Sequence, residues 1–268
     1  MYRADRIPQI RGRIRLRARL TTARREFMTR LDPSWSEQEK LSAELDFWIN
    51  QWDAKLRRGE FWNSDVQALL EPLGEWPQVT GDSRPDYDTI RWLEARAHGL
   101  RILHEVRIDD PGFFADKKVA DIGPGAVCFL EASGARVGIA IEPLAREFDT
   151  HGLLLRRDNV TYLPVAAEDL PIVDESVDIV VSRNNLDHVS DPVAVVHEVH
   201  RILRPGGVFL LIVHLEPEES ITEPHAFDSD DIHSLVDQFI TEREMIYHGG
   251  RTQGADTLAG VYRKPGTP

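Results

Sequence analysis

The sequence predicts an α/β fold: a mainly parallel sheet with helices on both faces, preceded by a smaller helical cap. From Lys117 onward, short apolar runs with strand character alternate with helix-like segments, a pattern typical of parallel sheets. All six tryptophans lie earlier, between residues 31 and 110, and several of them have helical spacing. With 268 residues and 41% hydrophobic content, the chain is long enough for one full core and an appendage.

The cap is expected to hold three helices separated by prolines and glycines. Ser36 and Glu39 form a capping box just before apolar residues at helical spacing, which marks the start of the first helix. The expected helices cover residues 36–57, a segment that begins after residue 63 or 64, and residues 87–106. Aromatic residues at helical spacing usually pack inward, so we favour core roles for the tryptophans over roles as a platform for sugar rings.

The segment after the cap is expected to alternate between strands and helices. The expected strands lie near residues 118–122, 137–141, 160–165, 178–182 and 208–214, and two further strands near 240–247 and 257–263. The expected helices lie near residues 127–134, 144–151, 191–203 and 229–238. The domain organisation that follows is an arm (1–30), a cap (31–110) and an α/β domain (111–268).

Charge is distributed unevenly along the chain. Residues 1–30 hold ten arginines and two acids, which gives this segment a charge of +8. Because the whole chain has a net charge of −13, the remaining residues together carry −21. An acidic body repels nucleic acid phosphates, so we expect a small or neutral substrate and no nucleic acid at the active site. For the arm, we favour a solvated tail or the edge strand of a homodimer over an electrostatic anchor.

Targeting signals and disulfides are not expected. No apolar run reaches the length needed to span a bilayer, and the arginine-rich start lacks the apolar core of a secretory signal. Cys128 is the single cysteine, so no intramolecular disulfide can form, which fits a reducing cytoplasm. We interpret Cys128 as a small packed residue rather than a nucleophile.

A glycine turn between two expected strands indicates a nucleoside site. The first strand ends in Asp121 and Ile122 and is followed by Gly123 and Gly125, and the second strand is followed by Glu142. Glycines let the backbone approach a ligand closely, and an acid at the end of the next strand can hold a ribose. The dinucleotide fingerprint needs a third glycine where Cys128 stands, which counts against NAD.

The same residues resemble motif I of the class I S-adenosylmethionine (SAM) methyltransferases, D-x-G-x-G-x-G. Asp121, Gly123 and Gly125 match it, whereas Val127 replaces the last glycine. Later segments resemble this family in the same order, from Lys117 to the C-terminus: A-E-D-L-P at 167–171, the strand at 176–182, D-H-V-S-D-P at 187–192, and R-I-L-R-P-G-G at 201–207. An acid often precedes the alanine of the first segment, where this chain has Ala166.

This resemblance implies a Rossmann-like, mostly parallel seven-stranded sheet whose last two strands form an antiparallel edge. It implies SAM as the cofactor and N-terminal helices that cover the cofactor cleft. Asp121, Gly123 and Gly125 would shape the SAM loop, and Glu142 would accept hydrogen bonds from the ribose hydroxyls. Ala167, through its backbone, and Glu168 would recognise adenine, and Asn184 at the end of the fourth strand would complete the cofactor site.

Histidines at the ends of the fourth and fifth strands are candidates for the acceptor side. His188 is our candidate general base for a hydroxyl acceptor, with Asp187 as its helper, because imidazole exchanges protons near neutral pH. The alternative is a histidine that only packs near the adenosine. His214, Glu223 and His225 are expected on the same face, as substrate or metal residues.

Mg²⁺ is kept open as a second cofactor. Some sugar O-methyltransferases use Mg²⁺ to bind two substrate oxygens, and Mg²⁺ prefers carboxylates to imidazole. The candidate ligands are Asp187, His214, Glu216, Glu218, Glu223 and His225. No fixed metal-binding spacing connects them, and a loop of acids is more often solvated.

The expected acceptor rests on a further resemblance. Segments at 138–145, 184–192 and 223–227 resemble bacterial methyltransferases of polysaccharide synthesis, which implies O-methylation of a saccharide hydroxyl on an oligosaccharide or a sugar precursor. The alternatives are a methyltransferase for another small molecule such as a phenol or natural product, an NAD-dependent sugar oxidoreductase, and a non-catalytic SAM-binding partner subunit.

Overall fold

A single sheet organises the part of the chain described by the computed structural model: residues 36–58, 64–77, 86–215, 225–248 and 256–266. The expected arm (1–30) and Glu223 lie outside these ranges. The strand order is β3-β2-β1-β4-β5-β7-β6; β7 runs antiparallel to β5 and β6, and the other neighbouring pairs are parallel. The strands are β1 (Lys118–Ile122), β2 (Val137–Ile141), β3 (Val160–Leu163), β4 (Val177–Arg183), β5 (Leu203–Leu215), β6 (Ile240–Tyr247) and β7 (Asp256–Arg263). The predicted seven-stranded, mostly parallel Rossmann-like fold is confirmed.

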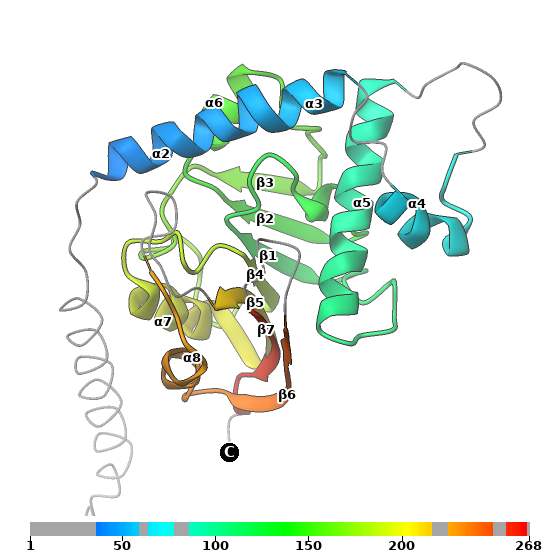
Figure 1. The fold of residues 1–268 in the computed structure, drawn as a ribbon. Coiled ribbons are helices and arrows are strands. Elements are labelled where there is room, and N and C mark those ends of the chain that lie inside the picture. Colours follow the sequence, from blue (N-terminus) through cyan, green and yellow to red (C-terminus); the bar gives the residue numbers. More distant parts are fainter. Residues whose placement is uncertain (1–35, 59–63, 78–85, 216–224, 249–255, 267–268) are drawn as a thin grey trace, which may run out of the picture.

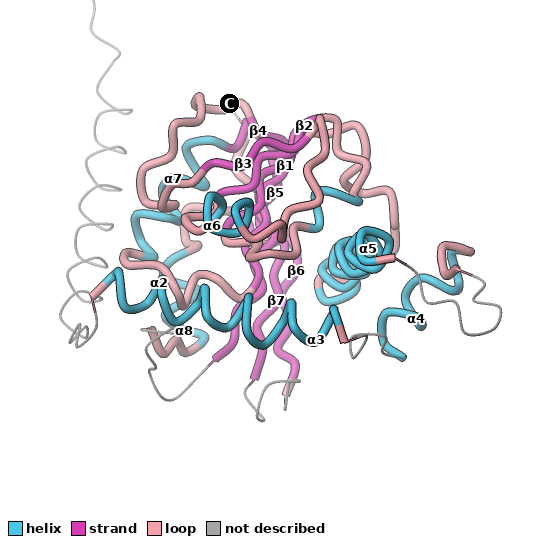
Figure 2. The backbone as a smooth tube through the Cα atoms, turned by 90° about the horizontal axis from the view of Figure 1, so that it is seen from above, coloured by secondary structure: helices cyan, strands magenta, loops and turns pink. Residues whose placement is uncertain are grey.

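Both faces of the sheet are covered, which explains why its central strands are continuous apolar runs rather than alternating ones. Successive side chains of a strand point to opposite faces. Accordingly, Ala120 and Ile122 of β1 belong to one core cluster, whereas Val119 belongs to the other. Helix α5 (Tyr87–Glu105) lies on one side of the sheet and α7 (Pro192–Ile202) on the other (Figure 2).

Two shorter helices complete the α/β domain, and one expected helix is replaced by a single turn. Helices α6 (Ala145–Thr150) and α8 (Ser229–Leu235) lie where the sequence predicts them. The helix expected over 127–134 is instead the 3₁₀ turn η3 (Phe129–Ala132). It ends close to Gly134, whose φ of +73° does not continue a right-handed helix. None of the helices in the described ranges is both long and apolar enough to cross a membrane.

The expected first cap helix is confirmed as one continuous helix that runs beside the sheet (Figure 1). It consists of α2 (Glu37–Asp46), the π-helical η1 (Phe47–Asp53) and α3 (Ala54–Arg57). Ser36 and Glu39 form the expected capping box. Leu41, Leu45 and Trp48 pack against the buried cluster that contains Val127, Leu144 and Phe148. The cap helix is therefore anchored next to the glycine turn.

The remaining cap elements are α4 (Ser64–Leu70), the 3₁₀ turn η2 (Glu71–Leu73) and α5. Helix α4 packs on α5 through the cluster of Val66, Leu70 and Leu93. The second and third expected cap helices are thus also confirmed.

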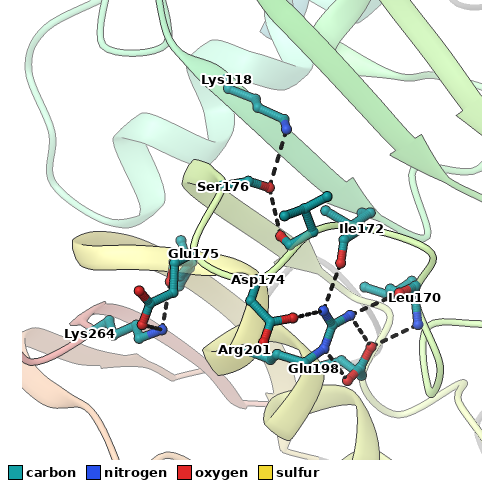
Figure 3. A network of polar contacts seen from close by, with 11 residues as sticks. Lys118, Leu170, Ile172, Asp174, Glu175, Ser176, Glu198, Arg201 and Lys264 are labelled. Carbon is teal, nitrogen blue, oxygen red and sulfur yellow. Dashed lines mark hydrogen bonds and ion pairs between the residues drawn. The ribbon is translucent and has the colours of Figure 1, made fainter.

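A polar clamp fixes the segment after β3 to helix α7 (Figure 3). We name residues 166–174 the clamped loop. The Arg201 guanidinium donates to the carbonyls of Leu170, at 2.8 Å, and Ile172, at 2.7 Å, and it pairs with Glu198 at 2.7 Å. Glu198 also accepts the Leu170 backbone N–H at 2.7 Å. Because every partner is on the loop or on α7, these contacts fix the loop to that helix.

Candidate active site

The site lies at the carboxyl ends of β1, β2 and β4. In an open α/β sheet, ligands bind where the strand order reverses. In this chain β2 and β3 follow β1 in one direction, and β4 and β5 extend in the other. Ile122 is in register with Ile141 of β2 and Ser182 of β4, so the residues that follow these strands meet at one edge.

The glycine turn needs both of its glycines. Gly123 and Gly125 have φ of +61° and +63°, in the left-handed region that favours glycine. A Cβ at Gly123 would lie 1.8 Å from Asn185 Nδ2, and a Cβ at Gly125 would lie 2.1 Å from Trp48 Cζ2. Conformation and space therefore both select glycine, as expected for a turn that lies against a ligand.

Glu142 connects the end of β2 to this turn. Its carboxylate accepts the backbone N–H of Gly125 at 3.0 Å and that of Leu144 at 2.9 Å. The side chain is buried, and burial raises its pKa to about 7. Glu142 thus fixes the turn while its oxygens border the site.

Asp121 lies within the core at the end of β1. Its carboxyl group is buried and lies 3.8 Å from the Cys128 thiol. Burial, and then repulsion from Glu142, raise the pKa of Asp121 well above its ordinary value. Cys128 is buried, and its pKa is raised as well, chiefly by burial, so the thiol is held in its protonated, weakly nucleophilic form.

Ala167 and Glu168, predicted to recognise adenine, both border the site. Glu168 Oε1 accepts the backbone N–H of Ser190 at 2.9 Å and that of Asp191 at 3.2 Å. This carboxylate therefore connects the clamped loop to the loop that carries His188.

Asn184 follows β4 with a φ of +48°, an uncommon conformation for a residue other than glycine. Its side-chain nitrogen lies 3.0 Å from Nε2 and 3.2 Å from Nδ1 of His214 on β5, so the amide contacts the imidazole. Asn184 Oδ1 is buried and has no hydrogen-bond partner among the described residues. A strained residue with an unused acceptor is characteristic of a binding site.

His188 and Asp187 occupy the loop after β4. His188 Nδ1 lies 2.8 Å from Glu44 Oε1 of the cap helix, and its Nε2 lies 4.0 Å from Asp187 Oδ1. Asp187 is 1% exposed, and burial raises its pKa. Neither oxygen of Asp187 has a hydrogen-bond partner in the described structure. The imidazole therefore has a hydrogen-bonded carboxylate on one side and a buried carboxyl group on the other.

His225, which lies shortly before α8 in the sequence, contacts the same loop. Its Nε2 donates to the Val189 carbonyl at 2.7 Å, and its ring stacks on Phe227. The side chain is buried, and burial lowers its pKa. A neutral imidazole that donates to a backbone carbonyl supports the position of the His188 loop.

These groups surround a cavity of about 440 Å³. Of the residues predicted for the site, the described cavity lining includes Gly123, Gly125, Glu142, Ala167, Glu168, Asn184 and His188. It does not include Asp121, Asp187, His214 or His225, although the last two contact lining residues. The predicted base, His188, and most of the residues predicted to bind the cofactor thus line one cavity.

One wall of the cavity comes from the cap helix, and sequence reasoning did not identify its residues individually. Four lining residues are spaced by four, three and four positions, so they share one face of the helix: Glu37, Leu41, Glu44 and Trp48. Phe47 and Asn185 also line the cavity. The signal was present in the sequence: two glutamates interrupt the apolar face of an amphipathic helix.

The described residues contain no group of three or more His, Cys, Asp or Glu side chains arranged to hold a metal ion. Three candidate Mg²⁺ ligands, Glu216, Glu218 and Glu223, lie outside the described ranges. The role of Mg²⁺ therefore stays a prediction.

A Rossmann-like sheet with a glycine turn, an acid after β2 and a histidine beside them defines a nucleoside-cofactor domain suited to group transfer. Residues 120–211 match the family described as "Methyltransferase domain". The chain is 30% identical over 159 residues to the ubiquinone biosynthesis O-methyltransferase of Pseudomonas aeruginosa, covering 51% of this chain and 67% of that protein. It is 31% identical over 140 residues to the enzyme of that name from Pseudomonas syringae, covering 48% and 60%.

The chain belongs to the class I SAM-dependent methyltransferases, and SAM is the family's cofactor. A solved SAM-dependent methyltransferase from Mesorhizobium loti has the same fold, with a TM-score of 0.50, 16% identity, and coverage of 60% of this chain and 96% of that one. The match spans less than two thirds of the Pseudomonas syringae relative. The comparisons therefore show the family and the methyl donor but not the acceptor.

Proposed function

We propose that this protein transfers the methyl group of SAM to a hydroxyl oxygen of a small, uncharged acceptor, with His188 as the general base. The observation that carries the proposal is that His188 lines the same cavity as Gly123, Gly125 and Glu142. The relatives in two Pseudomonas species are named as O-methyltransferases, which supports oxygen as the acceptor atom.

The residues of the cavity fit SAM. The glycine turn presents backbone to the cavity, and Glu142 places a carboxylate at the end of β2, where a ribose hydroxyl can donate to it. Ala167 and Glu168 are held beside it for the adenine. When bound, SAM supplies an activated methyl group and leaves as a neutral thioether.

The contribution of the chain to the reaction is proton transfer and alignment. The acceptor oxygen forms its bond to the methyl carbon as the carbon–sulfur bond breaks, and the hydroxyl proton passes to His188. A positioned base contributes about a hundred- to ten-thousandfold to such a step. Much of the remaining acceleration comes from holding the donor and acceptor in line.

The charge of the cavity narrows the acceptor class. Among its described lining residues are four glutamates, and no lysine or arginine. The glutamates are Glu37, Glu44, Glu142 and Glu168. Like charges repel most strongly in a site of reduced dielectric constant, so an acceptor without phosphate or carboxylate groups is favoured. This supports a saccharide hydroxyl on a neutral oligosaccharide over one on a nucleotide-linked precursor.

The aromatic rings in the cavity support the saccharide proposal and also a second candidate. Phe47 and Trp48 line the cavity from the cap, and aromatic rings pack against either the C–H face of a sugar or another ring. The name of the Pseudomonas relatives, ubiquinone biosynthesis O-methyltransferase, favours a phenol or natural-product hydroxyl as the second candidate.

The test is turnover of SAM with a panel of neutral mannosides, glucosides and phenols. We expect methylation of at least one saccharide, and the variant His188→Ala should lose turnover by a hundredfold or more, on the order of a base's contribution, while SAM still binds by calorimetry. Turnover of phenols alone would support the second candidate. Near-normal turnover in His188→Ala would remove His188 as the base. SAM binding without turnover of any acceptor would favour a non-catalytic partner subunit.

We also propose that the protein works in the cytoplasm and forms a homodimer. The buried, single Cys128 supports a reducing compartment. The homodimer rests on the strand-like alternation within residues 11–20. Light scattering of the full chain and of a chain that begins at residue 31 tests it, because loss of the dimer is expected only in the shorter chain.

A further inference from the structure

The cap helix contacts the His188 loop at two points on one of its faces. Glu44 Oε1 lies 2.8 Å from His188 Nδ1, and Glu37 Oε2 accepts a hydrogen bond from Ser190 Oγ at 2.9 Å. Glu37 and Glu44 are seven residues apart, which places them two turns apart on the same side of a helix. The helix therefore holds the loop through two carboxylates.

We propose that Glu44 is the positioning residue of His188. The carboxylate accepts the Nδ1–H of the imidazole, which fixes the ring and leaves Nε2 as the nitrogen that takes a proton. Which ring nitrogen carries the proton is set by the hydrogen bond that the other one makes. The inference rests on the proposed function, since it assigns Glu44 a task only where His188 is the base.

Asp187 is less suited to this task, although it is the neighbour of His188 in the sequence. Its nearest oxygen is 4.0 Å from Nε2, beyond hydrogen-bond distance. Burial also raises its pKa, because a charged carboxylate at 1% exposure is poorly solvated. Glu44 is partly exposed and lies 2.8 Å from Nδ1 of the ring, so it is the carboxylate that reaches the imidazole at hydrogen-bond distance.

The same helix also contacts the donor side of the cavity. Trp48, one turn after Glu44, lies against Gly125 and makes an edge contact with Phe148 at a centroid distance of 6.1 Å. One rigid element therefore touches both the glycine turn and the base. Docking of the cap helix places the imidazole relative to the donor site.

The experiment compares Glu44→Leu, which removes the acceptor, with Glu44→Gln, whose carbonyl oxygen can still accept the Nδ1–H. In Glu44→Leu we expect kcat and kcat/KM to fall together by about ten- to a hundredfold, while the SAM Kd stays within about threefold. Glu44→Gln should recover part of the loss. Asp46→Asn, on the exposed side of the same helix, is the matched control and should be unchanged.

A second measurement reads the ring itself in the resting protein. Long-range ¹H–¹⁵N spectra at about pH 8.5, above the titration of ordinary imidazole, distinguish the Nδ1–H and Nε2–H tautomers. The His188 signal among the ten histidines is the one that His188→Gln removes. We expect Nδ1–H in the wild type and in Glu44→Gln, and its loss in Glu44→Leu.

The two readouts separate the inference from the proposed function. A tautomer that does not change in Glu44→Leu overturns the inference, and so does an unchanged kcat in that variant when His188→Ala is inactive. If the tautomer changes as expected but His188→Ala keeps full activity, the contact with Glu44 is supported, and the assignment of His188 as the general base is refuted. Thermal unfolding of each variant confirms that the comparison is made on folded protein.

Discussion

Replacing Glu142 by glutamine tests the link between the glycine turn and the cofactor. The carboxylate accepts two backbone N–H groups, those of Gly125 and Leu144. A glutamine carbonyl can keep one of them, but the NH₂ group cannot accept the other. A buried donor without a partner costs about 1–3 kcal/mol, and each kcal/mol lowers Tm by about 2–4 °C in a chain of this size. We therefore expect Glu142→Gln to remain folded with a Tm lower by about 2–12 °C.

The effect on SAM binding should be of the same order as the effect on folding. A hydrogen bond to a charged group contributes about 1.5–3 kcal/mol, so the loss of the charge that receives the ribose hydroxyls should raise the SAM Kd by about ten- to a hundredfold. Calorimetric titration at about pH 8, where the wild-type carboxylate is ionised, measures it. Glu147→Gln, at an exposed position of α6, is the control.

The pH dependence gives the same prediction a second signature. Burial raises the pKa of Glu142 from 4.5 to about 7, so its folded form binds a proton that the unfolded chain releases between these values. Glu142 therefore lowers the free energy of unfolding as the pH rises from about 4.5 to about 7. SAM affinity should rise over the same range, because the carboxylate that accepts the ribose hydroxyls forms there. Both trends should be smaller in Glu142→Gln. Equal SAM affinity in variant and wild type at every pH would refute the ribose assignment.

Two further predictions concern the glycine turn and the clamped loop. Gly125→Ala should lose more stability than Gly152→Ala in thermal unfolding, and it should also weaken SAM binding. Both glycines have φ near +65°, but the added Cβ meets Trp48 at 2.1 Å in the first and open space in the second. Arg201→Lys should weaken SAM binding in calorimetry, because lysine cannot hold both Leu170 and Ile172 carbonyls while pairing with Glu198; unchanged affinity would exclude the clamp from cofactor binding.

The sheet and the donor side of the site were predictable because they depend on local signals. Apolar runs bounded by turn residues mark buried strands, and all seven strands lie within a few residues of the expected positions except β5, which begins five residues earlier at Leu203. Gly123, Gly125 and Glu142 follow directly from strand ends. In a parallel sheet, adjacent strand ends meet at one edge, so positions along the chain translate into positions in space.

The turn after Gly125 shows where local signals failed. The residues after it are compatible with a helix, but only Phe129–Ala132 form one turn. Phe129 and Leu130 are fully buried between α5 and the sheet, and Gly134 ends the turn with a positive φ. Tertiary packing thus overrides helix propensity, a competition that propensity alone does not resolve.

The acceptor side depends on a contact that no local pattern specifies. Glu44 and His188 are 144 residues apart, and their distance is set by how the cap helix packs through Leu41, Leu45 and Trp48 onto the domain. Hydrophobic burial is non-directional, so the apolar face of the helix predicts that it docks but not at which angle. Glu44 carries the missing information: a carboxylate that is partly withdrawn from water needs a donor, and the imidazole of His188 is the donor it reaches. Glu37 stays mostly exposed and pairs with Lys40 at 3.0 Å, so its contact with Ser190 constrains the helix less. A polar residue on the docking face of the cap helix therefore helps to set the register of the helix on the domain, and through it the position of His188.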